Sequence, residues 1–110
     1  MTGPEGGGAA EAAPTERLEA TIRGRVQGVG FRYFVVSRAM ELELVGWVAN
    51  APDGRVRSVA EGSRAALDAF EAALHDGPIG AIVDAVDVVR MPATGRFDRF
   101  AVRSGVHGGD

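Results

Sequence analysis

The residues most able to do chemistry lie between positions 24 and 32, in the stretch GRVQGVGFR. Three of its nine residues are glycines, which allow the backbone to turn several N–H groups toward one point. Arg32 follows directly after Phe31 and supplies a planar, two-pronged donor that suits the oxygens of a phosphate. These residue types indicate either a site for a phosphate-like anion or a tight turn followed by a solvent-exposed arginine.

The flanking residues indicate which elements must position this stretch. Residues 17–26 alternate between polar and apolar side chains, and this period of two predicts a strand with one buried face. Apolar residues then recur at helical spacing and predict a helix over about 31–42, with a stripe of Phe31, Phe34, Val35, Ala39 and Leu42. The stretch therefore spans a strand end, a loop and the first turn of a helix.

An anion fits this position because the first N–H groups of a helix have no intrahelical partner and carry the positive end of its dipole. Arg32 in the first turn opposes that dipole unless a negative group joins it. The spacing matches neither a Walker A loop nor the G-x-G-x-x-G fingerprint. From these residues alone, the anion site and the simple turn both stay open. The backbone that could surround an anion belongs to Gln27, Gly28, Val29, Gly30 and Phe31.

The rest of the chain first predicts a hairpin, with strands over about 44–50 and 55–61 joined by a turn at APDG. A helix follows, which is capped by Ser63 and ended by Gly77 and Pro78. Two further strands are predicted over about 81–90 and 97–103. The order is β-α-β-β-α-β with one extra strand. We therefore predict an α+β, ferredoxin-like sandwich: an antiparallel sheet with two helices on one face, plus a short extra C-terminal strand.

Length and composition predict one domain. Of the 110 residues, 1–16 are expected to form a disordered N-terminal extension, 17–103 the domain and 104–110 a flexible tail. The chain has no cysteine and only two histidines, so we expect no thiolate chemistry and no metal site. Outside the first sixteen residues, 12 acidic and 12 basic residues balance, which argues against nucleic-acid binding by bulk charge. Lacking a membrane-spanning run or a secretory signal, the protein is expected to be cytoplasmic.

Two motifs in the chain resemble those of the acylphosphatase family: GRVQGVGFR at 24–32 and GWVANAPDGRV at 46–56. The stretches ALDAFEAALHDGP at 66–78 and FDRFAVR at 97–103 give weaker support. The resemblance covers about residues 17–103. It implies a ferredoxin-like hydrolase that cleaves the carboxyl–phosphate bond of acylphosphates and needs no cofactor and no metal.

The resemblance also implies roles for particular residues. The motif arginine, which binds the phosphate, falls on Arg32, and the motif asparagine, which orients the attacking water, falls on Asn50. The phosphate cradle falls on the backbone from Gln27 to Phe31. Judged by its local sequence, Asn50 could equally be a turn asparagine that bonds its own backbone. The Gln27 side chain could donate to the anion or only orient the loop.

One position departs from the family pattern. The chain has Leu42-Glu43-Leu44 where the family often has Leu-Gly-Leu, and a glycine there would form a left-handed helix C-cap. We expect Glu43 to cost some stability at the helix end without touching either catalytic position.

Two other classes of function compete with the enzyme. One is a non-catalytic ferredoxin-like module that binds an anion or a protein partner. The other is an acylphosphatase-like piece of a larger carbamoyl-transfer protein, against which the chain length argues. An RNA-binding sheet would expose aromatic residues, whereas Trp47 is expected to pack in the core or on a sheet face. The favoured expectation is a monomer that acts on a small-molecule acylphosphate, with no nucleic-acid or membrane partner.

Overall fold

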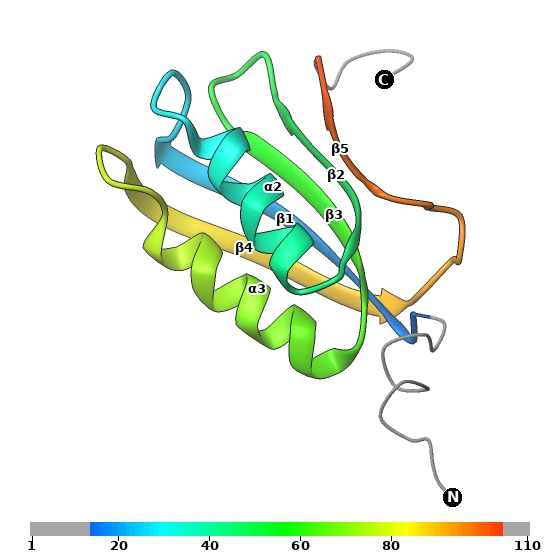
Figure 1. Cartoon of the computed structure of the whole chain (residues 1–110). Coiled ribbons are helices and arrows are strands. Elements are labelled where there is room, and N and C mark those ends of the chain that lie inside the picture. The colour runs from blue at the N-terminus through cyan, green and yellow to red at the C-terminus, as the bar shows by residue number, and fades with distance from the viewer. Residues whose placement is uncertain (1–13, 105–110) are drawn as a thin grey trace, which may run out of the picture.

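A computed structural model describes residues 14–104 of the chain. The described elements, in chain order, are β1 (Glu16–Arg25), α2 (Phe31–Glu41), β2 (Val45–Asn50), β3 (Val56–Gly62), α3 (Arg64–Asp76), β4 (Ile82–Pro92) and β5 (Phe100–Arg103). Figure 1 shows these elements as one twisted sheet with both helices on the same face. The predicted N-terminal extension and C-terminal tail fall mostly on residues 1–13 and 105–110, which lie outside the described residues.

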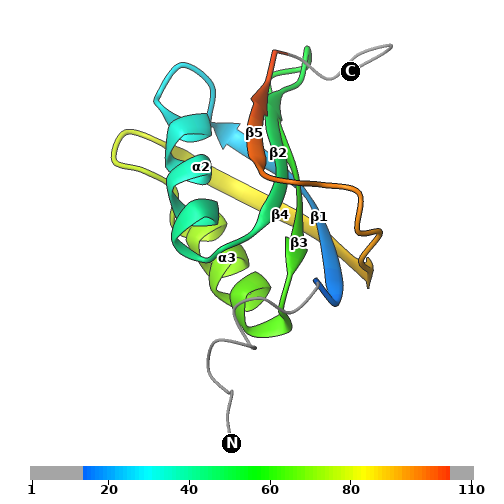
Figure 2. The same ribbon diagram turned by 45° about the vertical axis from the view of Figure 1, so that its right-hand side comes forward.

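The strands follow the order β4-β1-β3-β2-β5 across the sheet. The pairs β1–β4, β1–β3 and β2–β3 are antiparallel, whereas β5 pairs with β2 in parallel. The chain leaves β4 at one edge, crosses the end of the sheet and runs back along the opposite edge, as Figure 2 shows. The predicted ferredoxin-like α+β fold with a short extra C-terminal strand is confirmed. The sequence left the direction of that extra strand open, and β5 lies parallel to β2 because this crossing reverses the chain.

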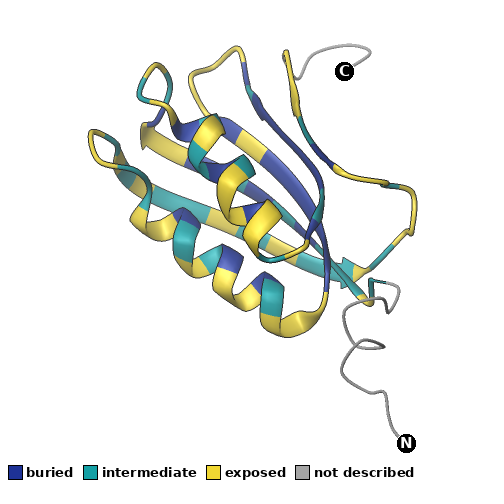
Figure 3. Cartoon of the chain, viewed as in Figure 1, coloured by how far each residue is buried: buried dark blue, intermediate teal, exposed yellow. Residues whose placement is uncertain are grey.

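The core lies between the sheet and the two helices. The alternation in β1 places Leu18 and Ile22 on the inner face, where both are fully buried, and Phe70 of α3 meets Phe100 of β5 edge to face at 6.1 Å between ring centroids. Figure 3 shows the outward faces of α2 and α3 exposed and the central strands largely buried. Burial of such a face supplies the main stabilising free energy of a small domain.

A smaller apolar cluster lies on the open face of the sheet. Trp47 packs there with Ala49 and Val59, and Phe97 covers them from the β4–β5 connection. The guanidinium of Arg103 lies 4.8 Å from the Trp47 ring centroid, a cation–π contact. The expectation that Trp47 packs on a sheet face is confirmed. The predicted strand over 97–103 is shorter, because Phe97 is committed to this cluster and strand pairing begins only at Phe100.

A buried carboxylate ties β3 to the β4–β5 connection. The Glu61 side chain accepts hydrogen bonds from the backbone N–H groups of Thr94 and Gly95, both at 3.0 Å, and from the Thr94 hydroxyl at 2.8 Å. Arg17 adds an ion pair at 3.1 Å. Burial by itself raises the pKa of Glu61, but these hydrogen bonds outweigh it, so the pKa is lowered.

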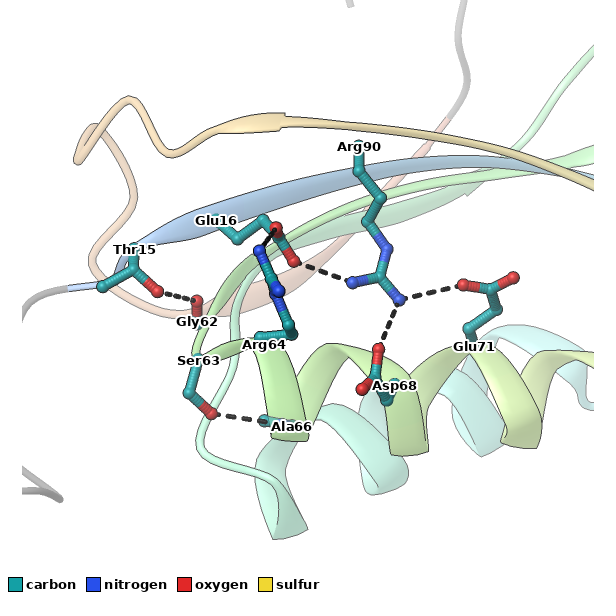
Figure 4. A network of polar contacts seen from close by, with 9 residues as sticks. All are labelled: Thr15, Glu16, Gly62, Ser63, Arg64, Ala66, Asp68, Glu71 and Arg90. Atoms are coloured by element: carbon teal, nitrogen blue, oxygen red, sulfur yellow. Dashed lines mark hydrogen bonds and ion pairs between the residues drawn. The ribbon is translucent and has the colours of Figure 1, made fainter.

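An arginine on β4 joins α3 to the start of β1. Figure 4 shows Arg90 reaching Glu16 at 2.8 Å, Glu71 at 2.9 Å and Asp68 at 3.0 Å. Burial alone would lower the pKa of Arg90, but its hydrogen bonds to the three carboxylates raise it. The network fixes the edge strand against the helix at the end of the sheet where the chain enters β1.

Helix α2 ends in a left-handed residue that is not glycine. Glu43 has a φ of 59°. Its N–H donates to the Met40 carbonyl at 3.1 Å, and the Leu44 N–H donates to the Ala39 carbonyl at 2.8 Å. These two bonds define a Schellman motif, in which this position usually holds glycine. Glu43 therefore adopts the left-handed conformation that a glycine would take at this position.

Candidate active site

The glycine-rich loop between β1 and α2 is anchored at both ends. Val26 and Phe31 flank the loop, and each is only 1% exposed. Phe31 also meets Phe34 edge to face, with ring centroids 6.0 Å apart. Since both flanks are held in the core, the loop between them has a defined path although Gly28 and Gly30 are exposed.

Two glycines give the loop its shape. Gly28 has a φ of 75° and Gly30, the N-cap of α2, has a φ of 79°. Apart from the adjoining residues of the loop and helix, no atom in the described part of the chain lies within 4 Å of where a Cβ would stand at either position, so space does not dictate the residue type. Glycine is favoured there because the left-handed backbone costs other residues about 1–2 kcal/mol.

The loop leaves a row of peptide N–H groups available at the start of α2. Among residues 14–104, no acceptor is found for the N–H groups of residues 28–33. Within the same described range, no side chain caps α2, and its first turn holds no carboxylate. Helix α3 differs, because Ser63 accepts from the Ala66 N–H at 3.1 Å. The positive end of α2 is therefore suited to an anion.

Arg32 lies in the first turn of α2 and is partly buried. Within the described part of the chain, its guanidinium has no ion pair or hydrogen bond, whereas Arg38 on the same helix pairs with Glu41 at 2.8 Å. A cation so placed opposes the helix dipole and is not compensated by a neighbouring carboxylate. Both features favour an anionic ligand beside Arg32.

Asn50 is the last residue of β2. The period of two places it on the same face as Val48, which is buried in the core beneath the helices. Among residues 14–104, no hydrogen bond of its side-chain amide is found, so the alternative of a turn asparagine that bonds its own backbone is not observed. The turn closes without it, through the Ala51 N–H donating to the Arg55 carbonyl at 2.8 Å.

Gln27 joins the two motifs directly. Its Nε2 donates to the Ala51 carbonyl at 2.8 Å and to the Arg55 carbonyl at 2.9 Å. Both hydrogens of the amide are used in these bonds, so the side chain has no N–H left for an anion. Of the two roles that the sequence left open for the Gln27 side chain, this geometry matches the orienting one. The loop after β1 and the turn after β2 are held side by side.

One cleft of about 410 Å³ opens between these segments, and it is lined by Val26, Gly28, Gly30, Phe31, Arg32, Tyr33, Asn50 and Val102. It brings Arg32 and Asn50 together with the glycines of the loop. Gln27 and Val29 do not line it. Val29 packs instead against the main core.

Sequence reasoning missed three lining residues: Val26, Tyr33 and Val102. The sequence did indicate that Tyr33 faces outward, because it follows Arg32 directly and lies off the apolar stripe of the helix. No sequence pattern indicated that Val102 belongs to the cleft, since its place near Asn50 depends on the parallel pairing of β5 with β2.

Across 14–104, no three His, Cys, Asp or Glu side chains are grouped so that they could hold a metal ion. None of the helices in this range has the length and apolarity to span a bilayer.

The fold and the cleft together describe a small ferredoxin-like α+β protein with a cleft at the start of its first described helix. The family model described as Acylphosphatase matches residues 18–102. An acylphosphatase from Salinibacter ruber is 47% identical over 93 residues, which are 84% of this chain and 98% of the relative. The chain belongs to the acylphosphatase family.

Solved structures agree with this assignment. The crystal structure of acylphosphatase from Bacillus subtilis superposes with a TM-score of 0.78 at 39% identity, covering 80% of this chain and 98% of that one. Full-length HypF, solved in a phosphate- and nucleotide-bound form, matches with a TM-score of 0.75 at 27% identity. That match covers 86% of this chain but only 12% of HypF, so a similar domain also occurs inside a much larger protein.

Proposed function

We propose that Arg32 and the backbone N–H groups of residues 27–31 hold the phosphoryl group of an acylphosphate, and that Asn50 orients the water that attacks it. The observation that supports this proposal is the cleft itself, in which Arg32, Asn50 and the loop glycines meet. The protein is an acylphosphatase, an enzyme that hydrolyses acylphosphates to a carboxylate and inorganic phosphate. The non-catalytic module is not favoured.

The reaction requires little covalent chemistry from the protein. The water oxygen bonds to phosphorus, the bond from phosphorus to the acyl oxygen breaks, and its electron pair leaves on a carboxylate. Because a carboxylate is a stable leaving group, no strong nucleophile has to be generated. The enzyme has to hold the phosphoryl group, stabilise its charge and place the water in line.

Arg32 and the loop would together bind the negative charge of the phosphoryl group. The guanidinium offers two parallel N–H donors to two phosphoryl oxygens, and the peptide N–H groups of the loop bind the remaining oxygen. These donors are fixed before the substrate arrives, because Val26 and Phe31 anchor the loop in the core. Preorganised donors of this kind stabilise a transition state without reorganisation during the reaction.

Asn50 would act on the water. Its carbonyl oxygen can accept a hydrogen bond from the water while its NH₂ group donates to a phosphoryl oxygen. One side chain would thereby fix the nucleophile relative to the phosphorus. Its position on the inner face of β2, with no competing side-chain partner among the described residues, supports this role.

We further infer that the enzyme acts as a cytoplasmic monomer, without metal and without nucleic-acid or membrane partners. The balance of 12 acidic and 12 basic residues outside the first sixteen supports the absence of a nucleic-acid partner. Elution as one monomeric species in light-scattering chromatography would support the monomer, and a dimer would contradict it.

The experiment is an assay of benzoyl phosphate hydrolysis with EDTA present. It compares the wild type with Arg32→Ala, Asn50→Ala and the control Arg38→Ala, an exposed arginine on the same helix. By analogy with the loss of one preorganised donor, we expect Arg32→Ala to raise the activation free energy by at least ~3 kcal/mol. Asn50→Ala should lower kcat strongly, and Arg38→Ala should match the wild type.

Each outcome bears on a separate part of the proposal. A wild type without turnover would favour the non-catalytic module. Unchanged activity in Arg32→Ala or Asn50→Ala would remove that residue from its role. Loss of wild-type activity on addition of EDTA would contradict the metal-free mechanism.

A further inference from the structure

The cleft is lined by more side chains than the binding of a phosphate requires. Arg32, Asn50 and the backbone of the loop provide its polar side. The remaining side chains that line it are apolar or aromatic: Val26, Phe31, Tyr33 and Val102. Among the described residues that line the cleft, none carries a carboxylate, and Arg32 is the only formal charge. A substrate with a phosphate at one end and an apolar group at the other matches this division.

Tyr33 forms one side of the apolar part. It follows Arg32 in the first turn of α2, and it is 82% exposed although it is a large aromatic residue. It makes no hydrogen bond with another residue in the described range. A ring so exposed contributes little to the core, yet it lines the same cleft as Arg32. It is therefore free to contact whatever group is attached to the bound phosphate.

Val102 lines the apolar part from a different element. The parallel register pairs Val102 of β5 with Val48 of β2, so both point toward the face that the helices cover. Val48 is buried there, whereas Val102 lies at the sheet edge and is 47% exposed. Val102 and Tyr33 thus line the cleft from two different elements, next to Arg32 and Asn50.

We propose that Tyr33 and Val102 form a subsite for the acyl group, and that the enzyme prefers acylphosphates with an apolar, aromatic or branched acyl chain over acetyl phosphate. The proposal rests on the proposed function of Arg32 and the loop. In an acylphosphate, a single oxygen separates the carbonyl carbon from phosphorus. Once the phosphoryl group is bound by Arg32, the carbonyl end of the acyl group therefore lies directly beside it, where Tyr33 and Val102 line the same cleft. An acyl group that carries a carboxylate would meet no further cation among the lining side chains.

The test measures kcat/KM for benzoyl phosphate and for acetyl phosphate in the wild type and in Tyr33→Ala and Val102→Thr. Threonine keeps the β-branched shape that β5 needs while replacing a methyl group with a hydroxyl. The control is Met40→Ala, an apolar residue on α2 that is 66% exposed and does not line the cleft. Inhibition by inorganic phosphate is also measured in each variant, because it reports only on the part of the cleft that binds the phosphate.

We expect Tyr33→Ala to lower kcat/KM for benzoyl phosphate about tenfold and that for acetyl phosphate less than twofold, by analogy with the discrimination of open apolar pockets. Val102→Thr should also lower the ratio of kcat/KM for benzoyl phosphate to kcat/KM for acetyl phosphate, but by a smaller factor. Tyr33→Phe should keep the wild-type ratio if the ring, rather than its hydroxyl, makes the contact. Met40→Ala and the inhibition constant of phosphate should not change.

Two results would overturn the proposal while leaving the enzyme's function intact. One is an equal loss on both substrates in Tyr33→Ala, and the other is an unchanged ratio in both Tyr33→Ala and Val102→Thr. A weaker inhibition by phosphate in Tyr33→Ala would likewise assign Tyr33 to the phosphate half. By contrast, an Arg32→Ala variant that hydrolyses both substrates at the wild-type rate would refute the proposed phosphate site itself.

Discussion

Arg32 and Arg38 lie on the same helix, yet only Arg38 has a carboxylate partner among the described residues. The two arginines illustrate how a residue at the surface can be distinguished by its electrostatic setting. Arg38 lies in the last turn, where a cation favours the helix dipole, and Arg32 lies in the first turn, where it opposes it. The unfavourable position of Arg32 makes structural sense when an anion binds beside it.

The shape of the Arg32 side chain should matter as much as its charge. In Arg32→Lys the positive charge remains, but the planar fork that meets two phosphoryl oxygens is lost. We expect kcat for benzoyl phosphate to fall about 10²-fold, the lower end of the range for a lost preorganised donor. Steady-state kinetics check this. A lysine variant with wild-type kcat would show that Arg32 supplies charge alone.

Gln27 should act through position rather than through contact with the substrate. In Gln27→Ala, the Ala51 and Arg55 carbonyls each lose the Gln27 donor and keep only a backbone N–H, and we expect a loss of about 1–2 kcal/mol in unfolding free energy. Activity should fall as well, because the loop and Asn50 are no longer held together. Urea denaturation and the benzoyl phosphate assay measure the two effects.

Gln27→Glu is the matched variant, since it keeps the size of the side chain but removes the N–H donors. It should be at least as damaging as Gln27→Ala. A glutamate variant with wild-type stability and activity would contradict the bridging role of Gln27.

At the scale of elements, the end of α2 carries the clearest conflict between residue type and backbone. Glu43 adopts a φ of 59° inside a Schellman motif. The left-handed backbone costs a side-chain-bearing residue about 1–2 kcal/mol, and the greater freedom of glycine in the unfolded chain offsets part of that cost.

We therefore expect Glu43→Gly to raise the unfolding free energy by about 0.5–1 kcal/mol without changing activity. The control is Glu43→Ala, which removes the carboxylate but keeps the strained backbone. Urea denaturation distinguishes the two variants. Equal stabilisation by alanine and glycine would show that the unfavourable carboxylate at the helix C-terminus, rather than the backbone, is responsible.

At the scale of the whole molecule, stability should depend on the protonation of Glu61. The hydrogen bonds from Thr94, Gly95 and Arg17 lower the pKa of this buried carboxyl below its usual value of 4.5. A lowered pKa in the folded state means that the stabilisation is fully present above 4.5 and is lost as the pH falls through the lower, folded-state pKa.

We expect Glu61→Gln to lower the unfolding free energy by about 2 kcal/mol at pH 7, because a carboxylate held by several donors becomes a neutral amide. The difference between the variant and the wild type should shrink as the pH falls below 4.5. Denaturation curves over this pH range check the prediction. A difference that stays constant down to low pH would mean that the charge of Glu61 contributes nothing to stability.

Several elements of this protein follow from local patterns in its sequence. The alternation in residues 17–26 and the helical stripe that begins at Phe31 predict their elements to within a few residues, because each pattern reflects a single buried face. The glycine pattern and Arg32 left an anion site and a simple turn equally open, and the paired motifs favoured the anion site and added Asn50. The sequence showed that Glu43 departs from the family pattern, whereas its left-handed conformation is seen only in the structure.

The remaining features depend on contacts between distant segments of the chain. The parallel pairing of β5, the bonds from Gln27 to the turn after β2, and the place of Val102 beside Asn50 all join segments far apart in the chain. No local pattern encodes such contacts, because they depend on which edge of the sheet the chain reaches after β4. The polar half of the cleft was therefore predictable from sequence motifs, and its apolar half appeared only when the strands were assembled.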